Sequence, residues 1–145
     1  MNISYRQATE RDYTAIHLLL ENQKLPTETV GTSITDFYLA IANEAIVGVA
    51  EFEYYGEDVL LRSVAVPTLL QKKQIGTQLV NWMLSLAKQK GIKRIVLLTE
   101  TASKFFAKKG FHMVDRSSIN NEAMKKSSQF CGGCCSSAMC MILDL

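Results

Sequence analysis

The chain has 145 residues, close to the commonest size of one domain and long enough to bury a hydrophobic core. It is 48% hydrophobic and 21% charged, which is typical of a globular protein. Its formal net charge is +2, from 16 Lys and Arg against 14 Asp and Glu, and this balance excludes the strongly basic surface of a nucleic-acid-binding domain. We therefore predict one domain, residues 1–145, that binds no nucleic acid.

Targeting signals are not recognisable in the sequence. No apolar stretch approaches the roughly 20 residues of a membrane-spanning helix, and Met1–Arg6 lacks the basic and apolar regions of a signal peptide. We expect a cytoplasmic protein with no membrane partner. Edge strands near the C-terminus could pair two copies, so a homodimer remains an open expectation.

The N-terminal elements are predicted to be a strand and a helix. Ile3–Arg6 is a short strand, and Thr9–Asp12 resembles a capping box with Asp in place of Glu, which opens a helix. One face of this helix is predicted to be apolar and to contain Tyr13, Ile16, Leu19 and Leu20. The polar residues 27–34 are predicted to form a loop or a short second helix.

An antiparallel meander is predicted next. Phe37–Ala42 and Ala45–Tyr55 alternate as a hairpin joined at Asn43-Glu44, and the turn Gly56–Asp58 leads into a third strand, Val59–Val66. Because neighbouring strands of a meander pair antiparallel, these segments predict one side of a sheet.

A long helix and a buried strand follow. The helix runs from about Ile75 to Lys90 and ends at Gly91. Its buried positions are predicted to be Ile75, Leu79, Met83 and Leu86 or Ala87. Ile95–Leu98 is a continuous apolar run, typical of a central strand covered on both faces. A crossover through the helix would make this strand a parallel neighbour of Val59–Val66.

The C-terminal third predicts four short elements. Ala102–Lys109 is a helix closed by Gly110, and Phe111–Val114 is a strand. Asn121–Ser128 is predicted to be helical and Ala138–Leu143 to be the last strand. The fold class is therefore α/β (α+β), with a mixed, mostly antiparallel central sheet flanked by helices.

The most informative stretch joins the third meander strand to the long helix. Val64–Pro67 ends the strand, and Gln71–Thr77 forms a basic turn and the helix start, where unpaired backbone N–H groups favour a phosphate. Lys72 and Lys73 add positive charge, and Gly76 lets a ligand approach the backbone. The stretch predicts a phosphate-bearing cofactor; the alternative is an ordinary strand-to-helix connection.

Two motifs carry a resemblance to a known family. Gln71 and Gly76 match the pattern Gln/Arg-x-x-Gly-x-Gly/Ala, although Gln74 stands at its first glycine. Ala102–Phe111 matches Ala-x-x-Phe-Tyr-x-x-x-Gly-Phe, except that Phe106 replaces the tyrosine. In this order and spacing the motifs resemble those of GNAT-family N-acetyltransferases, and the resemblance covers nearly the whole chain.

The resemblance implies an acyl-CoA acyltransferase fold and direct acetyl transfer from acetyl-CoA to an amine. We predict a small acceptor that is amino-acid-like and anionic; a further option is acetylation of protein lysines or N-termini. The main chain of Val64–Val66 would pair with the pantetheine arm as an extra strand, and an N–H group at Val66 would polarise the thioester carbonyl. The residues expected at the cofactor are Val64, Ala65, Val66, Gln71, Lys72, Lys73, Gln74, Ile75, Gly76, Thr77 and Phe106.

The replacement of tyrosine by Phe106 removes the group that in many relatives stabilises the thiolate leaving group. Three alternatives follow. CoA leaves as a thiolate, a water or another side chain supplies the proton, or the chain binds the cofactor without efficient turnover. We favour the first, because the thiol pKa of CoA is modest.

Glu53 and Arg62 are the predicted catalytic residues. Glu51 and Glu53 face one side of the sheet because they alternate along a strand, and Arg62 lies on the next strand, close to Glu53 if the intervening turn is tight. Glu53 would be the base, directly or through water, and Arg62 a clamp for an anionic substrate group. The alternative is a cross-strand ion pair between Glu53 and Arg62.

Part of the chain resembles a GNAT subgroup associated with arsenic resistance. The resemblance lies in Leu60–Val66 together with Glu53-x-x-Gly56, and in the tail from Phe130 to Ala138. Glu100, after the Ile95–Leu98 strand, is a second base candidate, although a solvated loop carboxylate is the simpler interpretation.

Four cysteines cluster at the C-terminal end: Cys131, Cys134, Cys135 and Cys140. We interpret them as ordinary thiols, with Cys134 nearest the active site. Because vicinal thiols bind soft metals, the alternative function is a non-catalytic thiol or metalloid-binding sensor on a GNAT scaffold. His17 and His112 have no ligand partner at suitable spacing, so no metal site is predicted.

Overall fold

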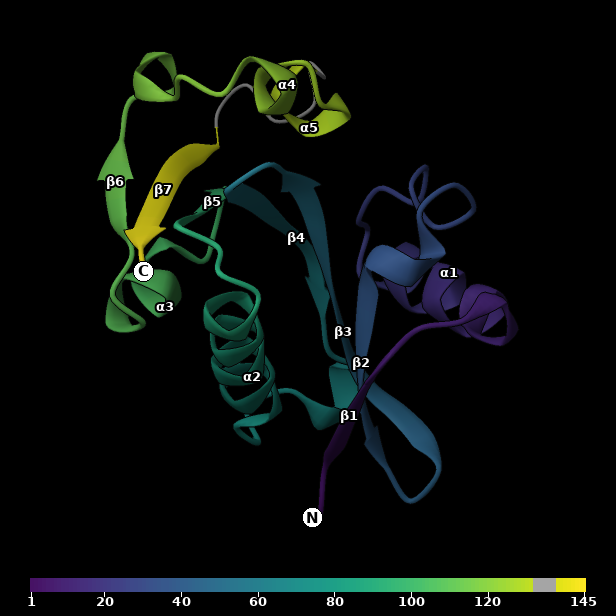
Figure 1. Ribbon diagram of the computed structural model, residues 1–145. Helices are drawn as coiled ribbons and strands as arrows, with labels where there is room; N and C mark the ends of the chain where they lie inside the picture. Colours follow the sequence, from purple (N-terminus) through teal and green to yellow (C-terminus); the bar gives the residue numbers. More distant parts are fainter. Residues whose placement is uncertain (132–137) are drawn as a thin grey trace. The chain divides into compact units, whose positions relative to one another are not determined.

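The computed structural model describes residues 1–131 and 138–145. Its strands are β1 (Ser4–Gln7), β2 (Phe37–Ala42), β3 (Ala45–Tyr55), β4 (Asp58–Ala65), β5 (Arg94–Thr99), β6 (His112–Val114) and β7 (Met139–Asp144). Its α-helices are α1 (Tyr13–Asn22), α2 (Ile75–Gln89), α3 (Ser103–Lys108), α4 (Glu122–Lys125) and α5 (Ser128–Cys131) (Figure 1).

The strands form a seven-stranded sheet in the order β1-β2-β3-β4-β5-β7-β6. The pairs β1–β2, β2–β3, β5–β7 and β6–β7 are antiparallel, and β4–β5 is parallel. The prediction of a mixed, mostly antiparallel sheet is confirmed. So is the crossover, because a parallel pair needs a long connection and α2 lies within it.

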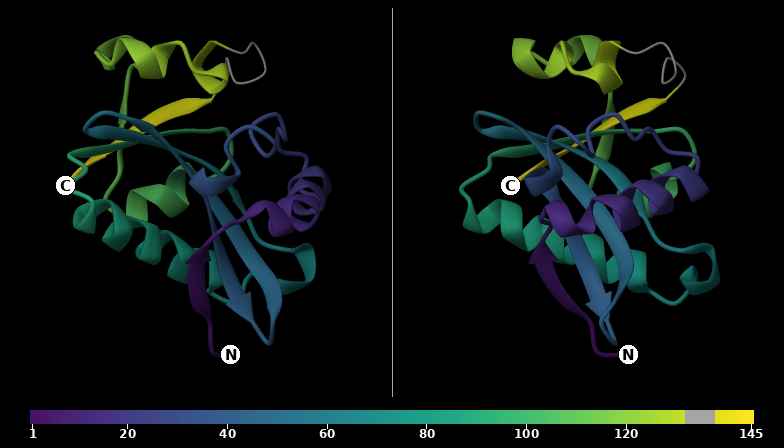
Figure 2. Two further views of the ribbon diagram at one scale, coloured as in Figure 1. Left: turned by 45° about the vertical axis from the view of Figure 1, so that its right-hand side comes forward. Right: turned by 90° about the vertical axis from the view of Figure 1, so that its right-hand side faces the viewer.

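Two compact units make up the chain. The first comprises Met1–Phe52 and Arg62–Leu86, and the second comprises Glu53–Leu61 and Ala87–Leu145. In the first unit, α1 and α2 lie on opposite sides of β1, β2 and β3 (Figures 1 and 2).

The α1 side of the first unit is a continuous apolar core. Its buried members are Ala8, Ile16, Leu19, Leu20, Val30, Phe37, Leu39, Val49 and Ala65. Phe37 and Leu39 are two residues apart, so both side chains point to the same face of β2. The opposite face of β2 contains Tyr38, whose ring centroid lies 5.8 Å from that of Trp82 on α2. Alternation along β2 therefore supplies one side chain to each helix in turn.

Local chemistry explains where these elements end. Asn43 and Glu44 have φ of +51° and +64°, as a two-residue hairpin turn requires, and they join β2 to β3 where predicted. Gly91, with φ of +76°, follows α2, and the amide of Ile92 donates to the carbonyl of Ala87 at 3.0 Å. This 6→1 bond satisfies one of the last helical carbonyls.

The second unit is built around β5. Ile95–Leu98 is buried throughout, as its apolar run predicts, and it lies between β4 and β7. One face of these strands packs into a second core formed by Leu60, Val96, Leu98, Ile119, Met124, Cys140 and Ile142. Met124 belongs to α4, whose N-cap is Asn121: its side-chain oxygen accepts from the Met124 amide at 3.1 Å.

Two sequence predictions are wrong in detail. Tyr13 is 43% exposed, because it lies in the first turn of α1 and its ring lies beside that of His17. Of the two alternatives for the last buried position of α2, Leu86 and Ala87, the structure selects Ala87, which is fully buried. The helix predicted over residues 121–128 is two short helices, α4 and α5, separated by a turn.

Candidate active site

The end of β4 leads directly into the loop that the sequence singles out. Ala65 and Val66 are buried, and Pro67, which has no N–H group to donate to a sheet, comes two residues after the last residue of β4. The Nε2 of Gln71 donates to the carbonyl of Val66 at 3.0 Å and to Oε1 of Gln23 at 2.9 Å. The first residue of the motif thus ties the loop to β4 and to the end of α1.

Just before α2, two loop residues with a left-handed backbone conformation flank one residue without it. Lys72 and Gln74 have φ of +65° and +68°, and α2 begins at Ile75. Successive N–H groups converge in such a segment, and the start of a helix adds further unpaired N–H groups and the positive end of the dipole. Gln74 occupies a left-handed conformation that glycine adopts without strain, which explains why the family pattern has a glycine at this position.

The start of α2 is also open. A Cβ built on Gly76 would meet only Cγ2 of Val66 among nearby atoms, at 3.9 Å. Lys72 and Lys73 are exposed, so their ammonium groups can approach an anion. The residues present therefore fit the pyrophosphate that the sequence predicts here.

Phe106 lies in α3, in the second unit. It is 7% exposed, and its ring packs edge-on against Phe111 at 5.5 Å and Phe105 at 5.0 Å between centroids. The tyrosine position of the motif is thus a packed aromatic side chain with no proton to donate.

A cluster of charged and polar side chains lies on β3, β4 and the connection after α1, in the first unit. We call it the Glu51 cluster; its members are Glu28, Thr29, Glu51, Arg62 and Ser63. Glu51 is fully buried, and its Oε1 accepts from Ser63 Oγ at 3.1 Å and from Thr29 Oγ1 at 3.0 Å. Arg62 Nε lies 3.6 Å from the same oxygen, and Arg62 Nη2 donates to Glu28 at 3.2 Å. The side chain of Arg62 is 2% exposed and that of Glu28 is 50% exposed.

Sequence reasoning gave Glu51 and Glu28 no role. Glu51 was placed on the same sheet face as Glu53, but nothing local distinguished it. Glu28 is 34 residues from Arg62 in the chain, in an irregular segment without a pattern. The sequence signal for this cluster is an arginine, Arg62, on a strand that is expected to be half-buried, because such an arginine needs a partner of opposite charge.

Glu53 belongs to the second unit and is half-buried. Its Oε1 accepts a hydrogen bond from the Tyr55 hydroxyl at 2.9 Å. The Nδ2 of Asn121 donates to the carbonyl of Tyr55 at 2.9 Å, so the end of β3 is anchored to the N-cap of α4. Glu100 is exposed, as expected of a loop carboxylate.

The remaining chemical groups form no metal site that the structure shows. Over residues 1–131 and 138–145, no group of three His, Cys, Asp or Glu side chains is arranged to hold a metal ion. Cys140 is buried, and burial raises the pKa of its thiol, as expected of a core cysteine. Cys134 and Cys135, like the side chain of Cys131, lie outside the described residues.

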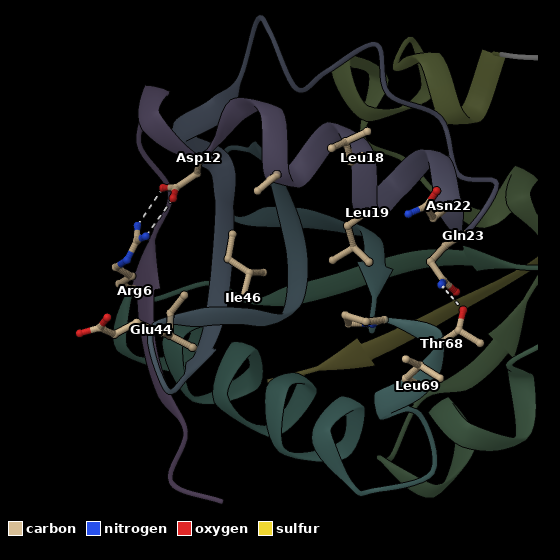
Figure 3. Close-up of a pocket in the computed structure, with 13 residues that line it drawn as sticks. Arg6, Asp12, Leu18, Leu19, Asn22, Gln23, Glu44, Ile46, Thr68 and Leu69 are labelled. Atoms are coloured by element: carbon tan, nitrogen blue, oxygen red, sulfur yellow. Dashed lines mark hydrogen bonds and ion pairs between the residues drawn. The ribbon is translucent and has the colours of Figure 1, made fainter.

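A cavity of about 1020 Å³ lies between α1, the β2–β3 hairpin and Pro67–Leu69 (Figure 3). The Arg6–Asp12 ion pair marks one end, and the hydrogen bond from Gln23 Nε2 to Thr68 Oγ1, 3.0 Å long, marks the other. Its apolar lining includes Leu19 and Ile46.

Comparison with known proteins now decides the family. Residues 33–113 match the family described as acetyltransferase (GNAT) domain, which is more than half of the chain. The chain belongs to the GNAT acetyltransferase family. No curated protein matches it significantly.

Solved structures share the fold of this GNAT acetyltransferase. N-acetylglutamate synthase from Neisseria gonorrhoeae, complexed with coenzyme A and N-acetyl-glutamate, is 21% identical with a TM-score of 0.85; the match covers 100% of this chain but 35% of that one. The chain thus spans about a third of that protein. Rv2747 from Mycobacterium tuberculosis, in complex with CoA, is 21% identical with a TM-score of 0.82, covering 98% and 99%.

A third neighbour matches over the whole of both chains. PaiA N-acetyltransferase from Thermoplasma acidophilum, in complex with coenzyme A, is 19% identical with a TM-score of 0.71, and the match covers 100% of both chains. At these identities the likeness establishes the GNAT acyl-CoA acyltransferase fold alone. Among the described residues, no helix has both the length and the apolar character needed to cross a membrane.

Proposed function

We propose that this GNAT acetyltransferase transfers an acetyl group from acetyl-CoA directly to the primary amine of a small, amino-acid-like acceptor. The observation that carries the proposal is the loop before α2. Its left-handed residues Lys72 and Gln74, followed by the open helix start at Gly76, support an anion site there for the pyrophosphate of the cofactor.

The cofactor would lie along β4 and the start of α2. In this arrangement the main chain of Val64–Val66 pairs with the pantetheine arm, and the N–H groups around Gln71–Thr77 hold the pyrophosphate. The N–H of Val66 would then donate to the thioester oxygen as negative charge develops on it. The neighbours complexed with CoA support this choice of cofactor.

Acetyl transfer needs a neutral amine, because an ammonium has no lone pair. In the proposed reaction Glu53 accepts the amine proton, directly or through one water. The amine nitrogen forms a bond to the acetyl carbon, the bond from this carbon to the CoA sulfur breaks, and the nitrogen releases its second proton to solvent as the amide forms. CoA leaves as a thiolate, since Phe106 has no proton to give; the sulfur is protonated later from solvent.

The acceptor's charge is less constrained than the sequence predicts. An anionic group would have to compete for the Arg62 guanidinium with Glu28 and Glu51, which already contact it. We therefore propose the amine, rather than an anion clamp at Arg62, as the recognised feature. The resemblance of Leu60–Val66 to arsenic-resistance-associated acetyltransferases makes arsenical and phosphinate amino acids acceptors to test.

The test is release of CoA from acetyl-CoA in the presence of an acceptor panel. Amino acids, polyamines, and phosphinate or arsenical amino acids form its arms. We expect acetyl-CoA to raise the thermal midpoint and at least one amine to release CoA above the amine-free rate. A thermal shift without release from any amine would contradict catalysis and favour a binding protein; no shift would contradict the cofactor.

The base is tested by Glu53→Gln, with Glu57→Gln as the matched control in the exposed turn that follows β3. General-base catalysis contributes on the order of 10²–10⁴-fold, so we expect kcat to fall at least a hundredfold in Glu53→Gln. Glu57→Gln should stay within twofold of the wild type. A comparable fall in Glu100→Gln, with Glu53→Gln unaffected, would move the base to Glu100.

A further inference from the structure

Ser63 interrupts an otherwise extended strand. It lies inside β4 with φ of +58°, a left-handed conformation that residues other than glycine rarely adopt. One residue in this conformation re-aims the strand that follows it, as a β-bulge does. The residues that follow are Val64–Val66, so the backbone of Ser63 sets the direction of the N–H and C=O groups proposed to meet pantetheine.

Glu51 holds Ser63 in this conformation. Its Oε1 accepts from Ser63 Oγ at 3.1 Å and from Thr29 Oγ1 at 3.0 Å, while Arg62 Nε lies 3.6 Å away. One buried oxygen therefore connects three separate segments: the connection after α1, strand β3 and strand β4. A left-handed residue persists only where the surrounding structure fixes it, and these contacts supply that constraint.

A buried carboxylate is not needed for packing at this position. A charge removed from water costs free energy, and buried ion pairs are often replaced by apolar residues without loss of stability. Glu51 is fully buried on β3, in a sheet whose other buried positions are mostly apolar. The distinguishing property of Glu51 is that one of its oxygens accepts from Ser63, the strained residue of β4 that immediately precedes Val64–Val66.

We propose that Glu51 is a positioning residue for acetyl transfer, which acts through Ser63 to orient the backbone of Val64–Val66 toward the pantetheine arm and the thioester. The proposal rests on the proposed function. It places Glu51 away from the reacting atoms: its effect reaches them through the geometry of β4.

The experiment uses two probes that separate positioning from general damage. CoA carries the pantetheine arm, whereas 3′-phospho-ADP is its nucleotide part and needs only the loop Gln71–Thr77. In Glu51→Leu, which has no oxygen to accept from Ser63, the dissociation constant for CoA measured by calorimetry should rise at least tenfold, while that for 3′-phospho-ADP stays within twofold. A loss of global packing would weaken both probes together.

The outcomes are distinct. Equal weakening of both probes, or no weakening of either, overturns the positioning role of Glu51. A folded wild type that does not bind CoA contradicts the proposed function and the positioning role with it. A wild type that binds CoA, next to a Glu51→Leu variant that binds it equally well, contradicts only the positioning role.

Milder variants keep the test decisive if Glu51→Leu does not fold. Thr29→Val is isosteric and removes one donor to Glu51, and Thr29→Ser restores the hydroxyl. We expect CoA, but not 3′-phospho-ADP, to bind three- to tenfold more weakly to Thr29→Val, and Thr29→Ser to recover the wild-type value. Thr27→Val, two residues earlier in the same connection, is the matched control and should bind both probes normally; equal CoA affinity in all three variants overturns the proposal.

Discussion

The proposed cofactor loop, Gln71–Gly76, and the Glu51 cluster belong to the same unit and are built in opposite ways. In the loop, the side chains from Gln71 to Gln74 are exposed and the backbone carries the distinctive geometry. In the cluster, Glu51 and Arg62 are buried and the side chains carry the geometry. The loop therefore depends on its backbone conformation, and the cluster depends on contacts between its side chains.

This difference separates binding from stability. An exposed loop side chain can change with little cost in unfolding free energy, so substitutions there should act on cofactor binding. A buried charge that loses its partner leaves an uncompensated charge in the core. Substitutions in the Glu51 cluster should therefore act on stability first. Four predictions test this contrast, from the largest expected effect to the smallest.

The largest effect is expected for Arg62→Met. It leaves the buried Glu51 carboxylate without the guanidinium 3.6 Å away, and such a loss typically costs about 3–5 kcal/mol of unfolding free energy. Urea denaturation measures it. The double variant Glu51→Leu with Arg62→Met removes both charges and should recover most of the loss; strictly additive losses would show that the two residues are not coupled.

A larger side chain at the start of α2 should weaken CoA binding without lowering the unfolding free energy. Gly76→Leu would block the approach of the pyrophosphate, so we expect CoA affinity to fall at least about tenfold, or roughly 1.4 kcal/mol. Stability should hold or rise, because glycine is about 1 kcal/mol worse than other residues inside a helix. Gln78→Leu adds the same side chain two residues further along α2 and is the control. If both variants bind CoA equally, the loop is not the site.

Relief of backbone strain gives a smaller effect. Gln74→Gly removes the cost of a left-handed conformation at φ of +68°, on the order of 1 kcal/mol, so the unfolding free energy should rise by about that amount. Lys73→Gly is the control: Lys73 is not in the left-handed region, so glycine there should bring no gain. A stabilisation of the same size in Lys73→Gly would argue against strain at Gln74.

The smallest effect concerns an ion pair that is half exposed. Arg6 donates two hydrogen bonds to Asp12, at 2.8 and 2.9 Å, and these lower the pKa of the Asp12 carboxyl from its usual value. A lowered pKa stabilises the fold above the unfolded-state pKa, and this stability is lost as pH falls through the folded-state pKa. Asp12→Asn should cost about 0.2–1 kcal/mol at pH 7, the usual contribution of a solvent-exposed ion pair.

The pH dependence is the sharper half of this prediction. The difference between wild type and Asp12→Asn, followed by urea denaturation, should shrink steadily as pH falls below about 4, near the unfolded pKa of aspartate. A difference that stays constant down to pH 2 would show that the charge of Asp12 contributes nothing.

Local signals predicted the fold well and the buried contacts poorly. Asn43-Glu44 could be recognised as a hairpin turn and Gly91 as a helix end, because a few neighbouring residues determine each. The cofactor loop was predicted for the same reason. The left-handed conformation of Ser63 had no local signal, since serine does not favour it and its partner Glu51 lies on another strand.

Contacts between residues far apart in the chain are what the sequence patterns do not predict. The sequence pattern predicts a substrate anion or Glu53 as the partner of Arg62. The contact that Arg62 makes with Glu28 spans 34 residues and depends on how an irregular connection folds back. Phe106 illustrates the opposite case: the motif alone showed that the usual proton donor is absent. The roles of Glu53 and Arg62 in catalysis stay predictions.

The central claim is that backbone groups between Val64 and Thr77 form the acetyl-CoA site. A crystal structure with CoA bound tests it most directly. The account predicts pantetheine hydrogen-bonded to the main chain of Val64–Val66 and pyrophosphate oxygens accepting from N–H groups between Gln71 and Thr77. CoA bound elsewhere, or held at the loop only by the ammonium groups of Lys72 and Lys73, would contradict it.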